Sequence, residues 1–132
     1  MNKSEPLLAP VGPGELLDKL SILEIKLEKI SDPNKLENIK TEYKQLESIK
    51  AKYIPLSKKI THLYQQLKSI NQELWKIEDD IRDCEKIKDF SETFIQLARS
   101  VYITNDKRAT TKKEINQLLK ANIIEEKSYT NY

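Results

Sequence analysis

The side chains best suited to chemistry lie in two helical segments of the sequence. The first segment carries a polar stripe whose members recur at alternating intervals of four and three residues: Tyr64, Lys68, Asn71, Trp75, Glu78, Arg82 and Glu85. This spacing places them on one face of a helix. Trp75 is the only tryptophan, and an indole in a charged stripe indicates that another helix covers it. We expect either a structural Glu78–Arg82 ion pair beside a packed tryptophan, or a half-buried polar pocket with Trp75 as a wall.

The second segment lies between Ile103 and Ile115 and contains no large apolar residue. If one helix runs through it, Asn105, Arg108 and Lys112 occupy successive core positions, and buried charges need partners. In that case Arg108 and Lys112 would line a polar cavity or an anion site. Two alternatives stay open: a break and restart of the helix at the capping-box sequence of residues 111–114, or a helix end that projects into solvent.

Further charged residues could meet these segments in the fold. Glu15 and Asp18 lie one turn apart near the start of the first expected helix, and they could supply counter-charges to Arg99, Arg108 or Lys112. Complementing the helix dipole is a simpler role for both acids. No catalytic residue can be assigned. The predicted binding candidates are Asn71, Trp75, Glu78, Arg82, Arg99, Tyr102, Asn105, Arg108 and Lys112.

Other chemistries find little support in the sequence. His62 and Cys84 are the only residues of their kinds, and no Ser/His/Asp or Cys/His set is visible. The acids at 15, 18, 80 and 83 are similar to the paired motifs that hold magnesium in helical nucleotide pyrophosphohydrolases, but the glutamate-rich first motif of that family is missing. Chorismate mutases hold a dicarboxylate with cationic residues, but the spacing of their opening helix does not match. We expect neither a metal nor a cofactor.

The composition narrows the class of protein. The chain has 132 residues, of which 33% are charged and two are glycine, a balance typical of long helices. A net charge of +2 and few aromatic residues near the basic stretches argue against nucleic acid as a partner. The single cysteine excludes an intrachain disulfide. With no signal-peptide pattern and no apolar run long enough for a membrane span, we expect a cytoplasmic protein that does not bind membranes.

Apolar periodicity predicts an all-α fold. The third helix, over about residues 55–86, has the longest apolar stripe, from Leu56 to Cys84. A tight turn near residues 88–92 makes it the antiparallel neighbour of the helix that follows. The first two helices, at about 13–30 and 33–53, would pack along this hairpin, as a four-helix bundle or an elongated coiled-coil-like bundle. We expect an extended leader over residues 1–12, one helical domain over 13–124 and a polar tail over 125–132.

Three stretches of the chain carry a family resemblance: Pro13–Lys26, Leu74–Arg82 and Leu97–Ala109. Together they resemble segments shared by a family of small bacterial proteins of unknown function. The resemblance spans nearly the whole chain. It implies a stand-alone helical domain with a continuous last helix, and it supplies no reaction.

Two functions are compatible with these features. The first is a non-enzymatic module that binds a protein or a small ligand, with self-association through residues 33–53 as one form. The alternative is a small enzyme acting on an anionic metabolite in a polar pocket between the first, third and fourth helices. There Arg99, Arg108 and Lys112 would act as clamps and Glu78 as acid or base. Internal pairing of these charges would favour the first function, and an open anion-binding cavity would favour the second.

Overall fold

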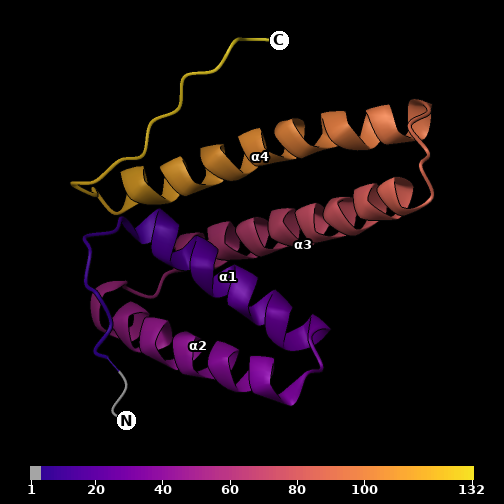
Figure 1. Ribbon diagram of the computed structural model, residues 1–132. Helices are drawn as coiled ribbons and strands as arrows, with labels where there is room; N and C mark the ends of the chain where they lie inside the picture. The colour runs from indigo at the N-terminus through magenta and orange to yellow at the C-terminus, as the bar shows by residue number, and fades with distance from the viewer. Residues whose placement is uncertain (1–3) are drawn as a thin grey trace.

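The protein is an all-α four-helix bundle, seen in a computed structural model that describes residues 4–132 (Figure 1). The helices are α1 (Pro13–Lys29), α2 (Pro33–Tyr53), α3 (Lys58–Lys86) and α4 (Glu92–Leu118). Within the described residues there is no β-strand. The expected fold class is therefore confirmed. The last helix, α4, ends at Leu118, within the expected helical domain of residues 13–124.

Local capping explains where the helices begin. Gly12 precedes Pro13 as the N-cap of α1, and the Asp32 side chain accepts a hydrogen bond from the Asn34 backbone N–H at 2.9 Å. At α3 the Ser57 side chain accepts from the Ile60 N–H at 3.1 Å. Because this cap lies beyond Pro55, α3 starts later than expected. Leu56 was wrongly placed on the apolar stripe, and it is 91% exposed.

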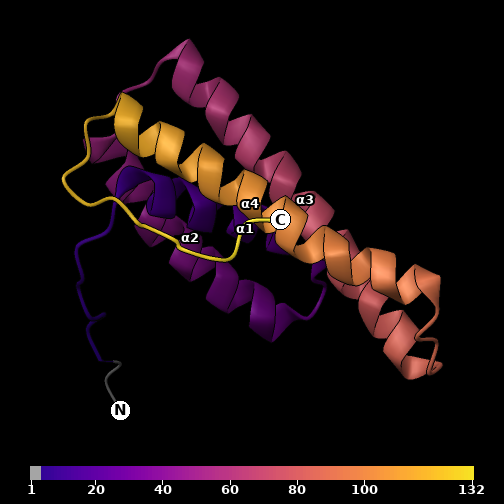
Figure 2. The ribbon, with the colours of Figure 1, turned by 90° about the horizontal axis from the view of Figure 1, so that it is seen from above.

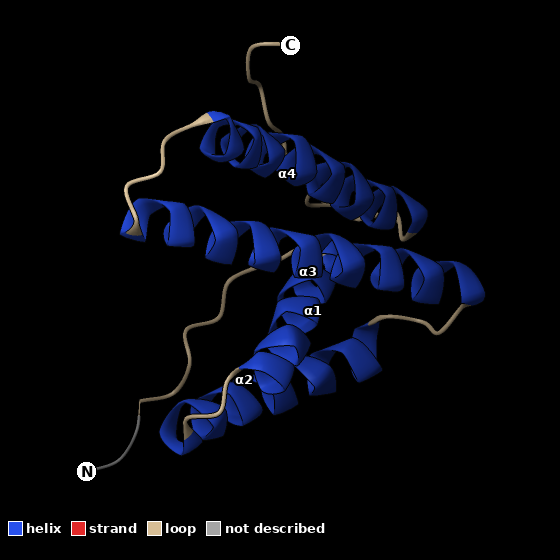
Figure 3. Cartoon of the chain, turned by 90° about the vertical axis from the view of Figure 1, so that its right-hand side faces the viewer, coloured by secondary structure: helices blue, strands red, loops and turns tan. Residues whose placement is uncertain are grey.

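Helices α3 and α4 form a hairpin, and α1 and α2 form a second pair that lies across one end of it. Helices α3 and α4 run antiparallel and are joined by a short turn (Figures 1 and 2). Helix α1 crosses this hairpin and packs on both of its members, while α2 packs along α1 (Figure 3). The far part of the hairpin extends beyond α1 and α2 (Figure 1). The crossing therefore divides the hairpin into a covered part and a projecting part.

The main core lies where α1 meets the hairpin. Leu17 of α1, Leu67 of α3 and Ile115 of α4 have no exposed surface. Helix α1 is buried on more than one side, as its broad apolar face predicted. Further along α3, Ile77 and Cys84 are also buried. Near the turn that joins α3 and α4, the rings of Phe90 and Phe94 lie edge to face, with their centroids 5.3 Å apart. No described helix combines the length and the apolar character needed to cross a membrane.

Candidate functional site

Helix α4 continues without a break through the polar segment, for which the sequence allowed either a continuous helix or an interrupted one. Its buried residues in this region are Thr104 and Thr111, whereas Asn105 and Lys112 lie at the edge of the interface. The expected core register was therefore off by one residue at these two positions. The Thr111 hydroxyl donates to the Lys107 carbonyl oxygen at 3.1 Å, so a buried threonine leaves no polar group unpaired. Arg108 lies at the centre of the segment.

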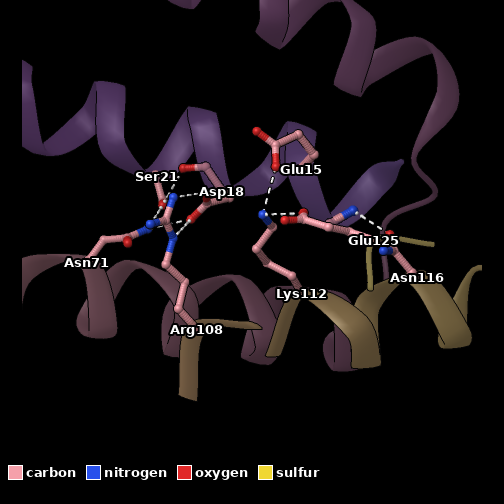
Figure 4. A network of polar contacts seen from close by, with 9 residues as sticks. Glu15, Asp18, Ser21, Asn71, Arg108, Lys112, Asn116 and Glu125 are labelled. Carbon is pink, nitrogen blue, oxygen red and sulfur yellow. Dashed lines mark hydrogen bonds and ion pairs between the residues drawn. The ribbon is translucent and has the colours of Figure 1, made fainter. Parts of the chain in front are cut away.

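Arg108 reaches a buried carboxylate on α1 (Figure 4). The side chain of Asp18 is 1% exposed. The Arg108 Nε donates to Asp18 Oδ1 at 3.0 Å, and its Nη2 donates to Asp18 Oδ2. The hydrogen bonds to Asp18 raise the pKa of the guanidinium. This two-point geometry is the strongest form of a pair between arginine and a carboxylate.

Helix α3 contributes the third member of this network. Asn71, which is 5% exposed, donates from Nδ2 to Asp18 Oδ1 and to Ser21 Oγ, both at 2.8 Å. The Ser21 hydroxyl donates to the Asp18 backbone carbonyl at 2.8 Å. The network therefore links α1, α3 and α4 through one buried carboxylate. Because the Asp18 carboxylate accepts hydrogen bonds from both α3 and α4, the network stabilises the helix crossing.

A second ion network lies one turn further along α4. The Lys112 ammonium, on a side chain only 12% exposed, lies 2.7 Å from Glu15 Oε2 and 3.0 Å from Glu125 Oε2. Burial alone would lower the pKa of Lys112, but the hydrogen bonds to both glutamates raise it above its ordinary value. The same contact lowers the pKa of Glu125. Lys112 therefore stays charged and joins α1, α4 and the C-terminal tail.

Close backbone contact holds α1 against α4 beside this network. The Gly14 N–H donates to Asn116 Oδ1 at 2.8 Å, and both residues are buried. A Cβ atom at position 14 would lie 2.5 Å from the Lys112 carbonyl oxygen, well inside van der Waals contact. Only glycine fits this approach.

The polar stripe of α3 follows α1 over part of its length and then continues beyond it. Lys68 contacts Glu24 and Glu28 of α1 at 3.2 and 2.8 Å. Further along α3, Trp75 is half-buried. Glu78 forms an ion pair of 3.4 Å with Arg82, and the side chains of the two residues are 50% and 77% exposed, respectively. The expectation that another helix covers the stripe is therefore met at its first half.

An open groove of about 490 Å³ begins where α1 leaves the stripe. We call it the Trp75 groove. Leu74 of α3 and two isoleucines of α1 supply its apolar lining, and charged side chains of α3 stand at its rim. Its lining residues are Ile22, Ile25, Asn71, Leu74, Trp75, Glu78, Asp79, Arg82, Asn105 and Arg108.

The structure brings most of the predicted candidates together and leaves two outside. Six of them line the Trp75 groove, and Lys112 lies one turn beyond Arg108. Arg99 is exposed, and its Nη1 donates to Gln96 Oε1 at 3.1 Å. Tyr102 is 45% exposed, and its ring packs on that of Tyr132 with the centroids 5.3 Å apart. Arg99 and Tyr102 therefore do not share a site with Arg108.

Sequence reasoning missed several members of the networks. Ser21 lies three residues after Asp18, and this spacing on one helix face was an available signal. Nothing in the sequence singled out Asn116 or Glu125, because the role of Asn116 depends on the crossing of α1 over α4 and that of Glu125 on the path of the C-terminal tail along α4. Among residues 4–132, no group of three His, Cys, Asp or Glu side chains could hold a metal ion.

The fold defines a small all-α module whose helices are linked by internal ion networks and whose surface carries a groove. The chain belongs to DUF6165, a family of unknown function, whose model matches residues 9–132. This match confirms the resemblance to an uncharacterised family. No curated protein and no solved structure matches the chain.

Proposed function

We propose that this protein is a non-enzymatic binding module that accepts a helical segment of a partner protein in the Trp75 groove. The observation that carries the proposal is the position of the only tryptophan, half-buried in the wall of a groove with an apolar lining and a charged rim. Tryptophan and arginine dominate the binding energy of many protein interfaces. The groove also provides apolar contact area together with polar groups that can orient a ligand.

Charge around the groove specifies the kind of partner. Between Glu73 and Glu85, α3 carries six acids and two bases. The charged side chains that line the groove are Glu78, Asp79 and Arg82 of α3 and Arg108 of α4, and Arg108 is already paired with Asp18. An amphipathic helix with an apolar stripe flanked by lysine or arginine complements this surface. The apolar stripe would contact Trp75 and Leu74, and the basic flanks would meet the acids of α3.

The positions of the charged candidates give the enzyme alternative less support. Two of its three anion clamps, Arg108 and Lys112, have carboxylate partners within the fold. The third, Arg99, is exposed on another part of α4. Glu78, the candidate acid or base, is half exposed and paired with Arg82. Internal pairing of these groups is the arrangement expected of a binding module. For its location we propose the cytoplasm, where a lone, buried Cys84 stays reduced.

Site-resolved photo-crosslinking in cells tests the groove. A photoreactive phenylalanine analogue replaces Glu78 at the rim in one variant and Glu42, on the exposed face of α2, in the matched control. We expect a specific adduct from position 78 and none from position 42. Adducts of equal yield at both positions, or none at position 78, would overturn the proposal. A crosslinked dimer at position 78 would identify the partner as a second copy.

Intrinsic fluorescence then reports on the groove directly. Because Trp75 is the only tryptophan, its emission monitors this site without further labelling. A peptide covering the crosslinked segment of the partner should shift the emission to shorter wavelength as it buries the indole. The same basic peptide should bind the variant Arg82→Glu more tightly, because the substitution replaces a base of the rim by a further acid. An unchanged emission at saturating peptide would exclude the groove as the binding site.

A further inference from the structure

A second depression lies on α4 and shares only Arg108 with the lining of the Trp75 groove. Its volume is about 260 Å³, and it is bounded by α1, α4 and the C-terminal tail. Its lining is strongly charged and contains four cations. The lining residues are Glu15, Arg108, Ala109, Lys112, Lys113, Asn116, Glu125 and Lys127.

Carboxylates of the tail already occupy this basic surface. Glu125 approaches Lys112 at 3.0 Å, and Glu126 approaches Lys113 at 3.2 Å. Two adjacent acids of the chain therefore contact two adjacent lysines of α4, and Figure 4 shows the first of these contacts beside Glu15. The pair of tail carboxylates has the chemistry of a ligand with two anionic groups.

The tail is attached by few and exposed contacts. The side chains of Glu125 and Glu126 are 55% and 71% exposed, and ion pairs in such positions contribute little to stability. Beyond them, the Tyr132 hydroxyl donates to Asp106 Oδ2 at 2.6 Å, and its ring packs on Tyr102. A competing anion therefore has only a small free-energy difference to overcome.

The cations would remain in place if the tail left. Arg108 uses Nε and Nη2 on Asp18, and its Nη1 donates to no residue between 4 and 132. Glu15 of α1 holds the Lys112 ammonium group on one side. The part of that group that now contacts Glu125 would therefore become available to an anion. Lys113 belongs to the same turn of α4 and has only Glu126 as its ion-pair partner among the described residues. These groups converge on one small depression.

We propose that this depression binds a small dianion, a phosphate or a dicarboxylate, and that Glu125 and Glu126 occupy the site until the anion displaces them. The dianion would bridge Lys112 and Lys113 in place of the two glutamates. Charge-assisted hydrogen bonds of this kind are strong in a partly buried site. The tail thereby sets the anion concentration at which the site fills, since any ligand must compete with a tethered carboxylate pair.

Calorimetric titration of the full chain with inorganic phosphate, and separately with succinate, tests the site. The variant Glu125→Gln/Glu126→Gln should bind one of the two probes about fivefold more tightly than the wild type, because its tail no longer competes. The control Glu37→Gln/Glu42→Gln changes the net charge by the same amount on exposed positions of α2, and it should leave the affinity unchanged. Sodium chloride keeps the ionic strength constant throughout.

Lysine variants complete the test. Lys113→Ala alters a side chain that is 44% exposed, and Lys112→Met keeps the apolar stem of a more buried one, so circular dichroism can verify that both still fold. Each should weaken binding by about tenfold. Failure of the Glu125→Gln/Glu126→Gln variant to bind either probe would overturn the site. Equal affinity in that variant and the wild type, or an equal gain in the α2 control, would overturn competition by the tail. Neither result bears on the Trp75 groove.

Discussion

Asp18 and Arg108 lie ninety positions apart in the chain and form a two-point ion pair between α1 and α4. The Asp18 carboxylate is 1% exposed, whereas the arginine side chain is 30% exposed. The carboxylate is therefore the group that depends on the pair, since a buried charge without a partner is very costly. Asn71 donates a further hydrogen bond of 2.8 Å to Asp18 Oδ1, which also accepts from the Nε of Arg108.

Replacing Arg108 should destabilise the fold strongly. We expect Arg108→Ala to lower the free energy of unfolding by about 3 kcal/mol, because it leaves the Asp18 carboxylate buried with Asn71 as its remaining side-chain donor. Urea denaturation followed by circular dichroism measures the change. The double variant Asp18→Leu/Arg108→Met should be more stable than Arg108→Ala, because it removes both charges together. A loss below about 1 kcal/mol for Arg108→Ala would contradict the structural role.

The two halves of the polar stripe on α3 should respond differently to mutation. Asn71→Leu removes a buried donor to Asp18 and Ser21, and we expect a loss of about 2 kcal/mol. Glu78→Gln removes an ion pair whose partners are at least half exposed, and we expect a change of less than about 0.5 kcal/mol. Chemical denaturation of both variants under one condition gives the comparison. Equal losses would mean that the division of the stripe by the end of α1 is wrong.

The approach of α1 to α4 predicts a third effect. Gly14→Ala would place a methyl group 2.5 Å from the Lys112 carbonyl oxygen, so the helices must separate. We expect a loss of about 2 kcal/mol, in the range found for overpacked cores. Lys19→Ala, on the exposed face of the same helix, is the matched control and should change stability by less than about 0.5 kcal/mol. Thermal unfolding of Gly14→Ala at the wild-type temperature would disprove this close contact.

Most of the fold could be predicted from the sequence because its determinants are local. Apolar spacing located the helices, and Pro13, Asp32 and Pro33 marked helix starts that the structure confirms. The antiparallel hairpin followed from the short turn between its members. The start of α3 was misplaced because the Ser57 cap was overlooked. Leu56 was consequently assigned to a core that it does not enter.

The site was only partly predictable because its geometry is set by non-local packing. The stripe through Asn71 and Trp75 was visible as a spacing, but where α1 would stop covering it depends on the angle of the helix crossing. The same crossing brings Gly14 to Asn116 and places Ser21 against Asn71. Tyr102 lies near Arg108 in sequence, yet it faces the tail, since residues six apart do not share a helix face.

The contact between Lys112 and Glu125 predicts a pH-dependent attachment of the tail. The hydrogen bond and charge of Lys112 lower the pKa of the Glu125 carboxyl below the ordinary glutamate value of about 4.3. A depressed folded-state pKa means that the contact stabilises the tail fully above the ordinary value. This stabilisation is lost as the pH falls through the lower, folded-state pKa. The attachment of the tail through Lys112 and Glu125 should therefore be lost in the acid range and kept near neutrality.

Carbon-detected NMR of the Glu125 carboxyl measures this directly. Its titration midpoint should lie lower in the wild type than in Lys112→Met, where the cation is absent. Contacts between the rings of Tyr102 and Tyr132 should weaken over the same pH range, because the tail that carries Tyr132 loses one of its attachments. Identical midpoints in the two proteins would show that Lys112 does not hold the tail. A shifted midpoint with unchanged ring contacts would assign the attachment to Tyr132 and Asp106 instead.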